Sequence, residues 1–316
     1  MSATKSNLNI VWIGFHEEGR YCIDKLVESG FTIDAIITLD SQAILKRSGA
    51  MDYEVIAEQH SIPLYKISHI NDPASVAILK EHKPDVLFVI GWSQILSEEV
   101  LATAKYVVGA HASKLPENRG SAPINWSLIK GEKTTGNTLI ELQPGVDTGD
   151  ILAQREFAIS FYDSCKTLYD QVAVTNAEMV LEFCENCILG DVQRVVQENK
   201  DEVVLPRRKP EHGEVNWELS AFEIYNFVRA LTHPYPGAFS YFSNTKYIIW
   251  SCSWFEPLMT ESVDVPGEII RVVYSFNEEN CGVLMACGDG QLFINEIEVA
   301  GRILRSKDLI RFFEGK

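Results

Sequence analysis

The residues with the clearest chemical potential are His111 and Asp147, which stand 36 positions apart. His111 ends an apolar, β-branched run (residues 106–108), and in an α/β sheet the carboxyl end of a strand is where chemistry is placed. Asp147 lies in the turn GVDTGD (residues 145–150), whose glycines let the backbone approach a ligand closely. We therefore predict that Asp147 is the partner of His111 and that the two share acid–base chemistry.

The loop between these residues, LPENRGSAPINW (residues 115–126), carries a third candidate. Arg119 is permanently charged and suited to a carboxylate or phosphate, so we expect it to hold the substrate; the alternative is that it braces the loop against a carboxylate. His111 and the turn could instead have purely structural roles. A histidine at a strand end is often a structural residue, and a D-x-G-D turn often forms hydrogen bonds with its own backbone. Asp150 is expected to cap the following turn.

The whole stretch resembles the signature of the folate-dependent formyltransferases, N-x-H-x-S-L-L-P, then R-G-x-A-P, then G-x-D-x-G. The residues that match the first two motifs are His111, Ser113, Leu115, Pro116, Arg119, Gly120, Ala122 and Pro123. The interval from His111 to Asp147 is the usual spacing of that family. Two positions differ: the family's asparagine falls on Gly109, and its first leucine after the serine falls on Lys114.

The resemblance implies formyl transfer from 10-formyltetrahydrofolate to an amine. His111 and Asp147 are then catalytic: the histidine accepts the amine's proton or stabilises the oxyanion, and the aspartate orients it. Predicted substrate contacts are Arg119, Ser113 and Asn118. Because Gly109 has no side chain, the amide that would help to stabilise the oxyanion is missing. Possible replacements are backbone N–H groups, the Ser113 hydroxyl, the Asn118 amide or a bound water.

The loop at residues 90–96 is unusually apolar for the end of a strand. Its tryptophan and leucine either pack under a neighbouring helix or line the pocket of a flat aromatic ligand, and the resemblance favours the second. The residues predicted to bind the folate are Ile90, Gly91, Trp92, Gln94 and Leu96, with Gly145 and Val146 closing the other side.

Apolar strands and amphipathic helices alternate along the first half of the chain, which predicts an α/β fold with a Rossmann-like, mostly parallel sheet and helices on both faces. Strands are expected at residues 8–13, 31–38, 63–66, 85–90, 106–108 and 138–142, and helices near residues 21–27 and at 53–60, 73–82 and 163–189. The first turn holds only Gly14 and Gly19, without the full G-x-G-x-x-G fingerprint, so NAD is disfavoured.

The pattern changes after a charged, proline-bearing connector. We expect a catalytic domain at residues 1–196, a linker at 197–212 and a small C-terminal β-barrel domain (OB-like) at 213–316. Its expected elements are one helix (residues 221–231) and strands at 238–242, 246–255, 267–274, 282–286 and 292–299. HPYPGAF and CGDGQLFI here resemble the small barrel found in formyltransferases of methionyl-tRNA and of a UDP-linked aminopentose.

The net charge of the chain helps to distinguish between possible substrates. The chain carries a net charge of −16, and residues 206–316 hold 11 Lys and Arg against 15 Asp and Glu, whereas a tRNA-binding barrel should be basic. The segment 41–53 offers only Lys46 and Arg47, and the opening GFHEEG resembles the aminosugar enzymes more than the tRNA enzyme. We therefore expect a nucleotide-linked amino sugar as substrate and no long nucleic acid as partner. The alternatives are methionyl-tRNA formyltransferase and a non-catalytic folate- or sugar-nucleotide-binding relative.

Seven scattered cysteines and no signal sequence are typical of free thiols in a reducing cytoplasm. Cys184 and Cys187 form a C-x-x-C without the second pair that a zinc site needs, so we expect neither metal binding nor redox work from them. No apolar run approaches the roughly 20 residues of a membrane span. Whether the chain forms a homodimer is left open.

Overall fold

The computed structural model describes residues 8–45, 47, 49–198, 204–254, 265–274 and 281–315. The chain forms two compact units. The first comprises Met1–Pro123, Thr134–Ala158 and Leu168–Pro206, and the second comprises Ile124–Lys133, Ile159–Thr167 and Arg207–Lys316. The predicted linker at residues 197–212 stays a prediction, and residues 199–203 of it lie outside the described residues.

The first unit is built on a seven-stranded sheet with the strand order β3-β2-β1-β4-β5-β6-β7. The strands are β1 (Ile10–Ile13), β2 (Ala35–Leu39), β3 (Leu64–Ile67), β4 (Val86–Val89), β5 (Tyr106–His111), β6 (Thr134–Glu141) and β7 (Ile151–Ala158). The first five strands are parallel, and β6 and β7 pair in antiparallel fashion. The predicted mostly parallel sheet is confirmed; β7 was not predicted.

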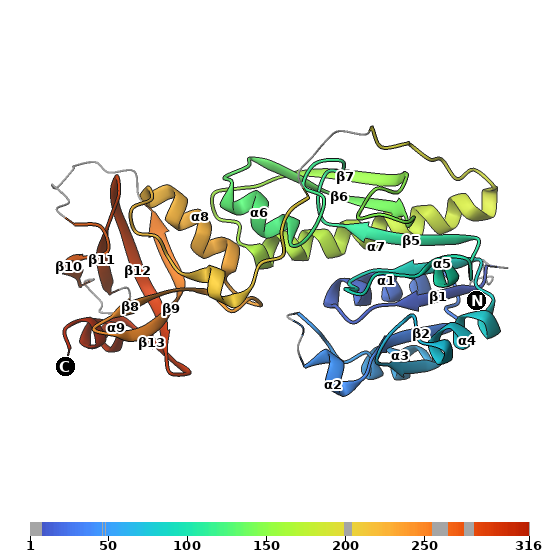
Figure 1. The fold of residues 1–316 in the computed structure, drawn as a ribbon, viewed down its shortest axis with the longest axis horizontal. Coiled ribbons are helices and arrows are strands. Elements are labelled where there is room, and N and C mark those ends of the chain that lie inside the picture. Colours follow the sequence, from blue (N-terminus) through green and yellow to red (C-terminus); the bar gives the residue numbers. More distant parts are fainter. Residues whose placement is uncertain are drawn as a thin grey trace. The chain divides into compact units, whose positions relative to one another are not determined.

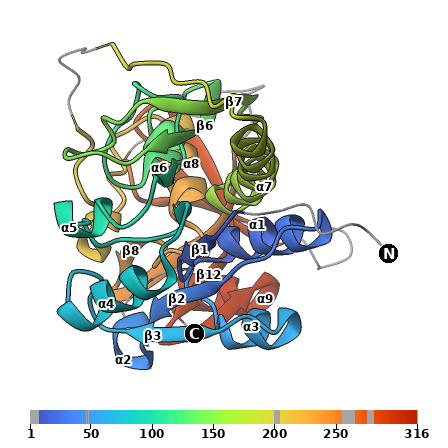
Figure 2. The ribbon, with the colours of Figure 1, turned by 90° about the vertical axis from the view of Figure 1, so that its right-hand side faces the viewer.

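Helices cover both faces of this sheet, as the sequence predicts. One face packs against α1 (Glu17–Glu28), α3 (Glu54–His60) and α7 (Cys165–Leu189), and the other against α4 (Pro73–His82) and α5 (Glu98–Leu101). Figure 2 shows the two groups on opposite sides of the strands, and Figure 1 shows α7 running along β5, β6 and β7. The inner strands are buried on both faces, which is why they read as continuous apolar runs.

Parallel packing also fixes the position of the site. Strands β1, β4 and β5 run in the same direction and are neighbours, so their carboxyl ends meet at one edge. The short helices α2 (Ser41–Ile44) and α6 (Pro123–Ile129) follow β2 and the His111 loop. The pairing of β4 with β5 therefore brings the loop after β4 close to the histidine at the end of β5.

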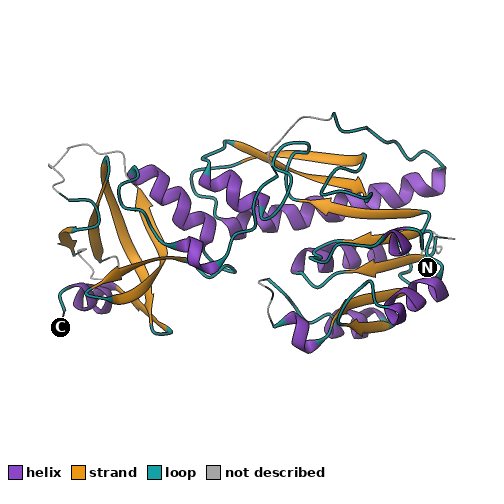
Figure 3. Cartoon of the chain, in the orientation of Figure 1, coloured by secondary structure: helices purple, strands orange, loops and turns teal. Residues whose placement is uncertain are grey.

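The second unit contains an antiparallel sheet with the order β10-β11-β12-β9-β8, and β13 pairs with β12 (Figure 3). Its strands are β8 (Ala238–Phe242), β9 (Thr245–Trp254), β10 (Ile269–Val273), β11 (Gly282–Cys287), β12 (Gly290–Val299) and β13 (Arg302–Arg305). The antiparallel β domain is confirmed, and Phe255, the last residue of a predicted strand, lies outside the described residues. Among the described strands β10 and β8 end the sheet without pairing with each other, so closure into a barrel stays a prediction.

In the described part of the chain after residue 207, two α-helices pack on this sheet, whereas the sequence predicted one. The predicted helix is α8 (Ala221–Leu231), which begins with a capping box in which Ser220 and Glu223 bond each other's backbone. The second is α9 (Ser306–Phe313), whose Leu309 and Phe313 pack into the core of this unit. A connector, η1 (Pro210–Gly213), precedes α8.

The C-x-x-C motif lies in the last turns of α7, with Cys184 buried and Cys187 half-buried as free thiols. Burial raises the pKa of Cys187 to about 11 and that of Cys184 further. A raised thiol pKa leaves little of the reactive thiolate at neutral pH. No helix in the described part of the chain is long and apolar enough to cross a membrane.

We predict that Cys187 resists thiol reagents at pH 8. With a pKa of about 11, its thiolate fraction at that pH is ~0.1%, so modification should be roughly 100-fold slower than for free cysteine and should accelerate with rising pH. Stopped-flow titration with an aromatic disulfide reagent measures this, and the guanidinium-unfolded protein is the control. A rate at pH 8 equal to that of the unfolded chain would contradict the prediction.

Candidate active site

His111 ends β5, with a side chain that is 8% exposed. Its Nε2 lies 2.9 Å from the carbonyl oxygen of Asn118, and its Nδ1 lies 3.5 Å from Asp147 Oδ2. A carbonyl can only accept a hydrogen bond, so Nε2 carries the proton that it donates there. In the neutral ring the basic nitrogen is then Nδ1, which faces the carboxylate. The structure thus brings the two predicted catalytic side chains together.

Asp147 is held in an unusual conformation for this role. Its φ is +54°, in the left-handed region that side chains other than glycine seldom adopt. The backbone N–H of Gly120 donates to Oδ2 (2.9 Å), and the Nε2 of Gln197 donates to the carbonyl oxygen of Asp147 (2.9 Å). Among the described residues no hydrogen bond reaches Oδ1, and the side chain is 23% exposed. Oδ1 is therefore the oxygen that this arrangement offers to a substrate.

The predicted folate loop follows β4. Gly91 has a φ of +65°, and a Cβ there would lie 2.4 Å from the Cβ of His16, so only glycine fits. Trp92 and Leu96 pack against the apolar core on the α4 face, and the Trp92 ring lies 5.7 Å from that of Phe15. The indole N–H of Trp92 is buried and has no partner among the described residues.

Two members of this predicted site have other contacts. Ile90 is fully buried in the core, so only its backbone can reach a ligand. The Gln94 amide accepts from the N–H of Ile70 (2.8 Å) and donates to the carbonyl of Ser68 (2.8 Å), which braces the loop. Their roles in binding stay predictions.

The turn on the other side is tight. Gly145 has a φ of +124°, and a Cβ there would lie 2.5 Å from Thr148 Oγ1. Val146 is 47% exposed at the tip of the turn. Leu142 precedes the turn and packs on the same core cluster as Trp92 and Leu96. An apolar surface with a buried, unpartnered N–H fits a flat ring with a polar edge, such as a pterin.

The three predicted substrate-binding residues are engaged within the protein. Ser113 is fully buried, and its hydroxyl donates to the carbonyl of Glu117 (2.6 Å). Arg119 is 7% exposed and donates to Gln197 Oε1 from Nε (3.2 Å) and Nη2 (2.6 Å). Asn118 has a φ of +56° and presents its carbonyl to His111. All three shape the loop, so direct contact with substrate stays a prediction.

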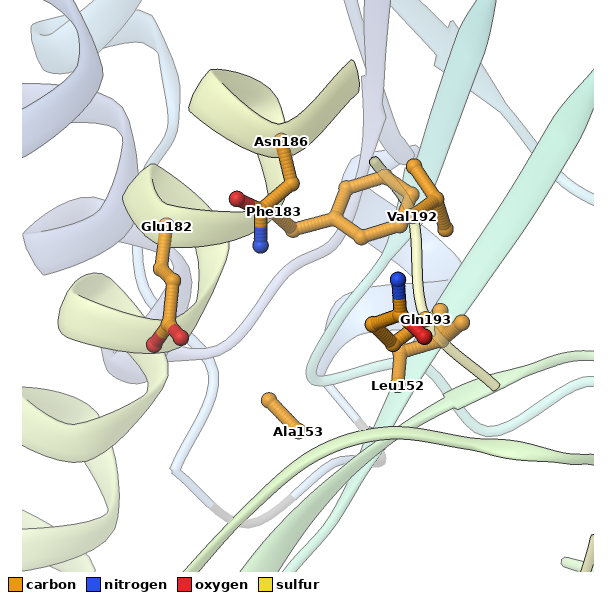
Figure 4. Close-up of a pocket in the computed structure, with 7 residues that line it drawn as sticks. All are labelled: Leu152, Ala153, Glu182, Phe183, Asn186, Val192 and Gln193. Carbon is orange, nitrogen blue, oxygen red and sulfur yellow. The ribbon is translucent and has the colours of Figure 1, made fainter. Parts of the chain in front are cut away.

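A small hollow between α7 and β7 lies elsewhere in this unit. Figure 4 shows Phe183 and Asn186 of α7 opposite Leu152 and Ala153 of β7. It offers only about 10 Å³, room for a single water molecule. None of its lining residues is a predicted site residue, so it is no candidate for the ligand site.

Two family models match nearly the whole chain. One, described as formyl transferase, matches residues 9–183, and the other, described as formyl transferase C-terminal domain, matches residues 207–313. The chain belongs to the formyl transferase family. The donor used by this family is formyl-tetrahydrofolate, and membership indicates formyl transfer to an amine.

Similar sequences and structures are of several kinds. The methionyl-tRNA formyltransferase of Geobacter metallireducens is 30% identical over 300 residues, 94% of this chain and 93% of the relative. HypX from Aquifex aeolicus in complex with tetrahydrofolic acid has a TM-score of 0.69 at 21% identity; the match covers 98% of this chain, which spans about half (48%) of HypX. An N-formyltransferase from Helicobacter canadensis, in complex with folinic acid and dTDP-3-aminofucose, has a TM-score of 0.67 at 18% identity, covering 91% of this chain and 98% of that one. At such identities the two structures show the fold alone.

Gly109 is one of the two positions at which the chain differs from the family motif, and it is the one that removes a polar side chain. It lies inside β5, paired with Val89 and Ile140, and its φ is not in the left-handed region. A Cβ there would lie 2.7 Å from Leu142 Cδ2 and 3.0 Å from its Cγ. The space that the family's asparagine would enter is therefore occupied by an apolar side chain. A water molecule or a polar donor in that space, which the sequence allowed, does not fit this packing.

Three residues near the site were missed in the sequence. Gln197 was counted as part of a linker, although its amide contacts both Asp147 and Arg119. His16 and Glu18, in the GFHEEG turn, form a pair at 3.4 Å beside Gly91, and burial raises the pKa of the Glu18 carboxyl. The signal for these two was a pair of ionisable residues, two positions apart, in the turn after the first strand.

We predict that Gly109→Asn alone does not raise kcat, because its Cβ would collide with Leu142. The double variant Gly109→Asn with Leu142→Ala removes the collision, and if the amide then acts as an oxyanion donor, kcat rises by up to ~10²–10³ over Leu142→Ala alone. Steady-state kinetics on wild type, both single variants and the double variant measure this. A large gain from Gly109→Asn alone would contradict the steric argument.

Proposed function

We propose that this formyl transferase transfers the formyl group of 10-formyltetrahydrofolate to the amine of a nucleotide-linked amino sugar. The observation that carries the choice of acceptor is the use of cations in the second unit. Arg302, Arg305 and Arg311 are engaged with the unit's own carboxylates, at 2.6 to 3.2 Å. The neighbouring carboxylates offset the charge of these arginines, which lowers the local positive potential that would attract a phosphate backbone.

Two further cations of this unit are also engaged. The Arg229 guanidinium, 9% exposed, donates to the carbonyls of Ser160 (2.9 Å) and Asp163 (2.8 Å). Arg208 lies over the rings of Trp126 and Phe227, and burial lowers its pKa. Residues 206–316 carry a net charge of −4, which argues against the basic face that tRNA binding needs.

We assign the acid–base steps to His111 and Asp147, an assignment supported by the 3.5 Å between His111 Nδ1 and Asp147 Oδ2. The amine nitrogen attacks the formyl carbon, the carbon–N10 bond of the donor breaks, the amine loses a proton and N10 gains one. The proton that the amine loses passes to Asp147 Oδ1 or to His111 Nδ1, the basic nitrogen of the neutral ring, and is then delivered to N10 of the donor. Gly120 holds Oδ2, so the carboxylate presents a fixed oxygen to the acceptor.

A second candidate function has its own support. Relatives named methionyl-tRNA formyltransferase are 30–31% identical to this chain over 92–94% of it. Lys46, in the segment where the tRNA enzyme is expected to be basic, lies outside the described residues, and Arg47 stands beside it. A relative that binds folate or sugar nucleotide without turnover is the third candidate.

The acceptor prediction is tested directly. With 10-formyltetrahydrofolate as donor, the protein should formylate at least one member of a panel of UDP-, dTDP- and GDP-linked amino sugars. Product is measured by mass spectrometry, with methionyl-tRNA as the competing acceptor and folate release as the readout common to both. Faster formylation of methionyl-tRNA, with micromolar and steeply salt-dependent binding, would establish the second candidate instead.

His111→Ala and Asp147→Asn should each lower kcat by roughly 10³-fold or more, and their effects should not multiply, because groups that act as one unit are lost together. Single-turnover kinetics with excess protein measure both variants and the double variant. Asp150→Asn, in the same turn, is the matched control and should retain activity. A double variant whose loss equals the product of the single losses would argue against a coupled pair.

A further inference from the structure

Gln197 lies in the chain segment after α7 and is 6% exposed. Its Nε2 donates to the carbonyl oxygens of Asp147 (2.9 Å) and Gly149 (2.6 Å). Its Oε1 accepts both bonds from the Arg119 guanidinium. Carbonyls only accept and a guanidinium only donates, so the orientation of the amide is fixed by its neighbours.

The two carbonyls belong to the turn that presents the catalytic carboxylate. Asp147 is in the left-handed region, which costs free energy and persists only where surrounding contacts impose it. Gly149 lies so close to the neighbouring strand that a Cβ would overlap the carbonyl oxygen of Glu141. Gln197 supplies hydrogen bonds to the backbone of this turn, whereas Gly120 bonds the side chain of Asp147.

Arg119 joins the same arrangement from the His111 loop. Its carbonyl accepts from the N–H of Leu205 (2.7 Å), and the next residue, Gly120, is the one that bonds Asp147 Oδ2. One amide therefore connects the loop that follows His111 to the turn that carries Asp147. Both ends of the His111–Asp147 pair are set by a residue that touches neither side chain.

We propose that Gln197 is a positioning residue: through its N–H bonds to Asp147 and Gly149 it sets the direction of the Asp147 carboxylate relative to His111. The inference rests on the proposed formyl transfer at this pair. It assigns a role in catalysis to a segment of the chain that the sequence presents only as a connector.

Backbone contacts hold Gln197 in place independently of its side chain. Val195 exchanges two hydrogen bonds with Ile151 of β7, at 2.8 and 2.9 Å. Further along, Leu205 pairs with the Arg119 loop through the N–H of Ser121 (3.1 Å). Substitutions of the side chain should therefore leave the segment where it is, which makes them informative.

Two substitutions separate the two ends of the amide. Gln197→Met keeps the length and removes every hydrogen bond, whereas Gln197→Glu keeps an acceptor for Arg119 and loses both donors to the turn. We expect each to lower kcat by about 10²-fold, the cost of a misplacement near 1 Å, with the KM of both substrates nearly unchanged. Gln193→Met is the matched control, because Gln193 is exposed on the same segment and bonds only Asp191 among the described residues.

A background variant distinguishes positioning from general damage. In Asp147→Asn protein, Gln197→Met should cause no further loss of kcat, since the group that it positions is already disabled. A loss that multiplies, or a fall confined to the melting temperature, would overturn the proposal. Wild-type kcat in Gln197→Glu would overturn it as well, because the Arg119 contact alone would then suffice.

Hydrogen exchange decides the same question without activity. The Gly120 amide bonds Asp147 Oδ2, so its exchange should accelerate ~10-fold or more in both Gln197 variants and stay unchanged in Gln193→Met. Unchanged exchange would overturn the positioning role. If the wild type formylates no acceptor, the proposed function fails while the exchange result still decides for or against Gln197.

Discussion

The site depends on a left-handed backbone conformation at Asp147, which residues other than glycine seldom adopt. Left-handed φ at a non-glycine residue costs free energy, and here it aims Oδ2 at His111 and at the N–H of Gly120. The cost is offset by hydrogen bonds from two loops that are remote in sequence. Because several segments contribute these bonds, the geometry of the His111–Asp147 pair depends on the folded first unit as a whole.

The parallel sheet explains why few contacts are needed to bring the segments of the site together. Strands β4 and β5 end side by side, which places the apolar loop after Val89 next to the histidine that ends β5. The antiparallel addition of β6 then returns the chain past β5, with Val108 opposite Glu141, so the Asp147 turn arrives at the same edge. The order of the strands brings the Asp147 turn near His111. The hydrogen bonds from Gly120 and Gln197 then fix the position of Asp147 more closely.

Much of this could be read in the sequence, and the rest failed for identifiable reasons. Buried strands and amphipathic helices show themselves as apolar runs and 3.6-residue periods, so α4 and α8 were placed with their observed bounds. The edge strand β7 is half-exposed and mixed in composition, which hides it, and α9 follows directly from β13 without a turn signal. The family motif indicated His111 and Asp147, and the structure shows them adjacent.

Contacts between residues that are distant in the sequence could not be predicted from the sequence pattern. Gln197 stands in a polar, charged stretch, and nothing local distinguishes it from Gln193. The burial of Ser113 and Arg119 depends on the way in which the loop folds back, so their types suggested substrate contacts that the structure does not display. Such residues are found only once the fold supplies their neighbours.

The Leu142 packing bears on whether the site works. Replacing a family asparagine by glycine would leave a cavity in a merely eroded site, yet here a leucine from the end of β6 fills the space and extends the apolar surface beside Trp92. The aspartate at position 147 lowers stability, because its φ is +54° and glycine would be more stable there. A protein without turnover would gain stability from glycine at this position. The filled space at Gly109 and the left-handed backbone of Asp147, held by hydrogen bonds from Gly120 and Gln197, favour a working variant of formyl transfer over a non-catalytic relative.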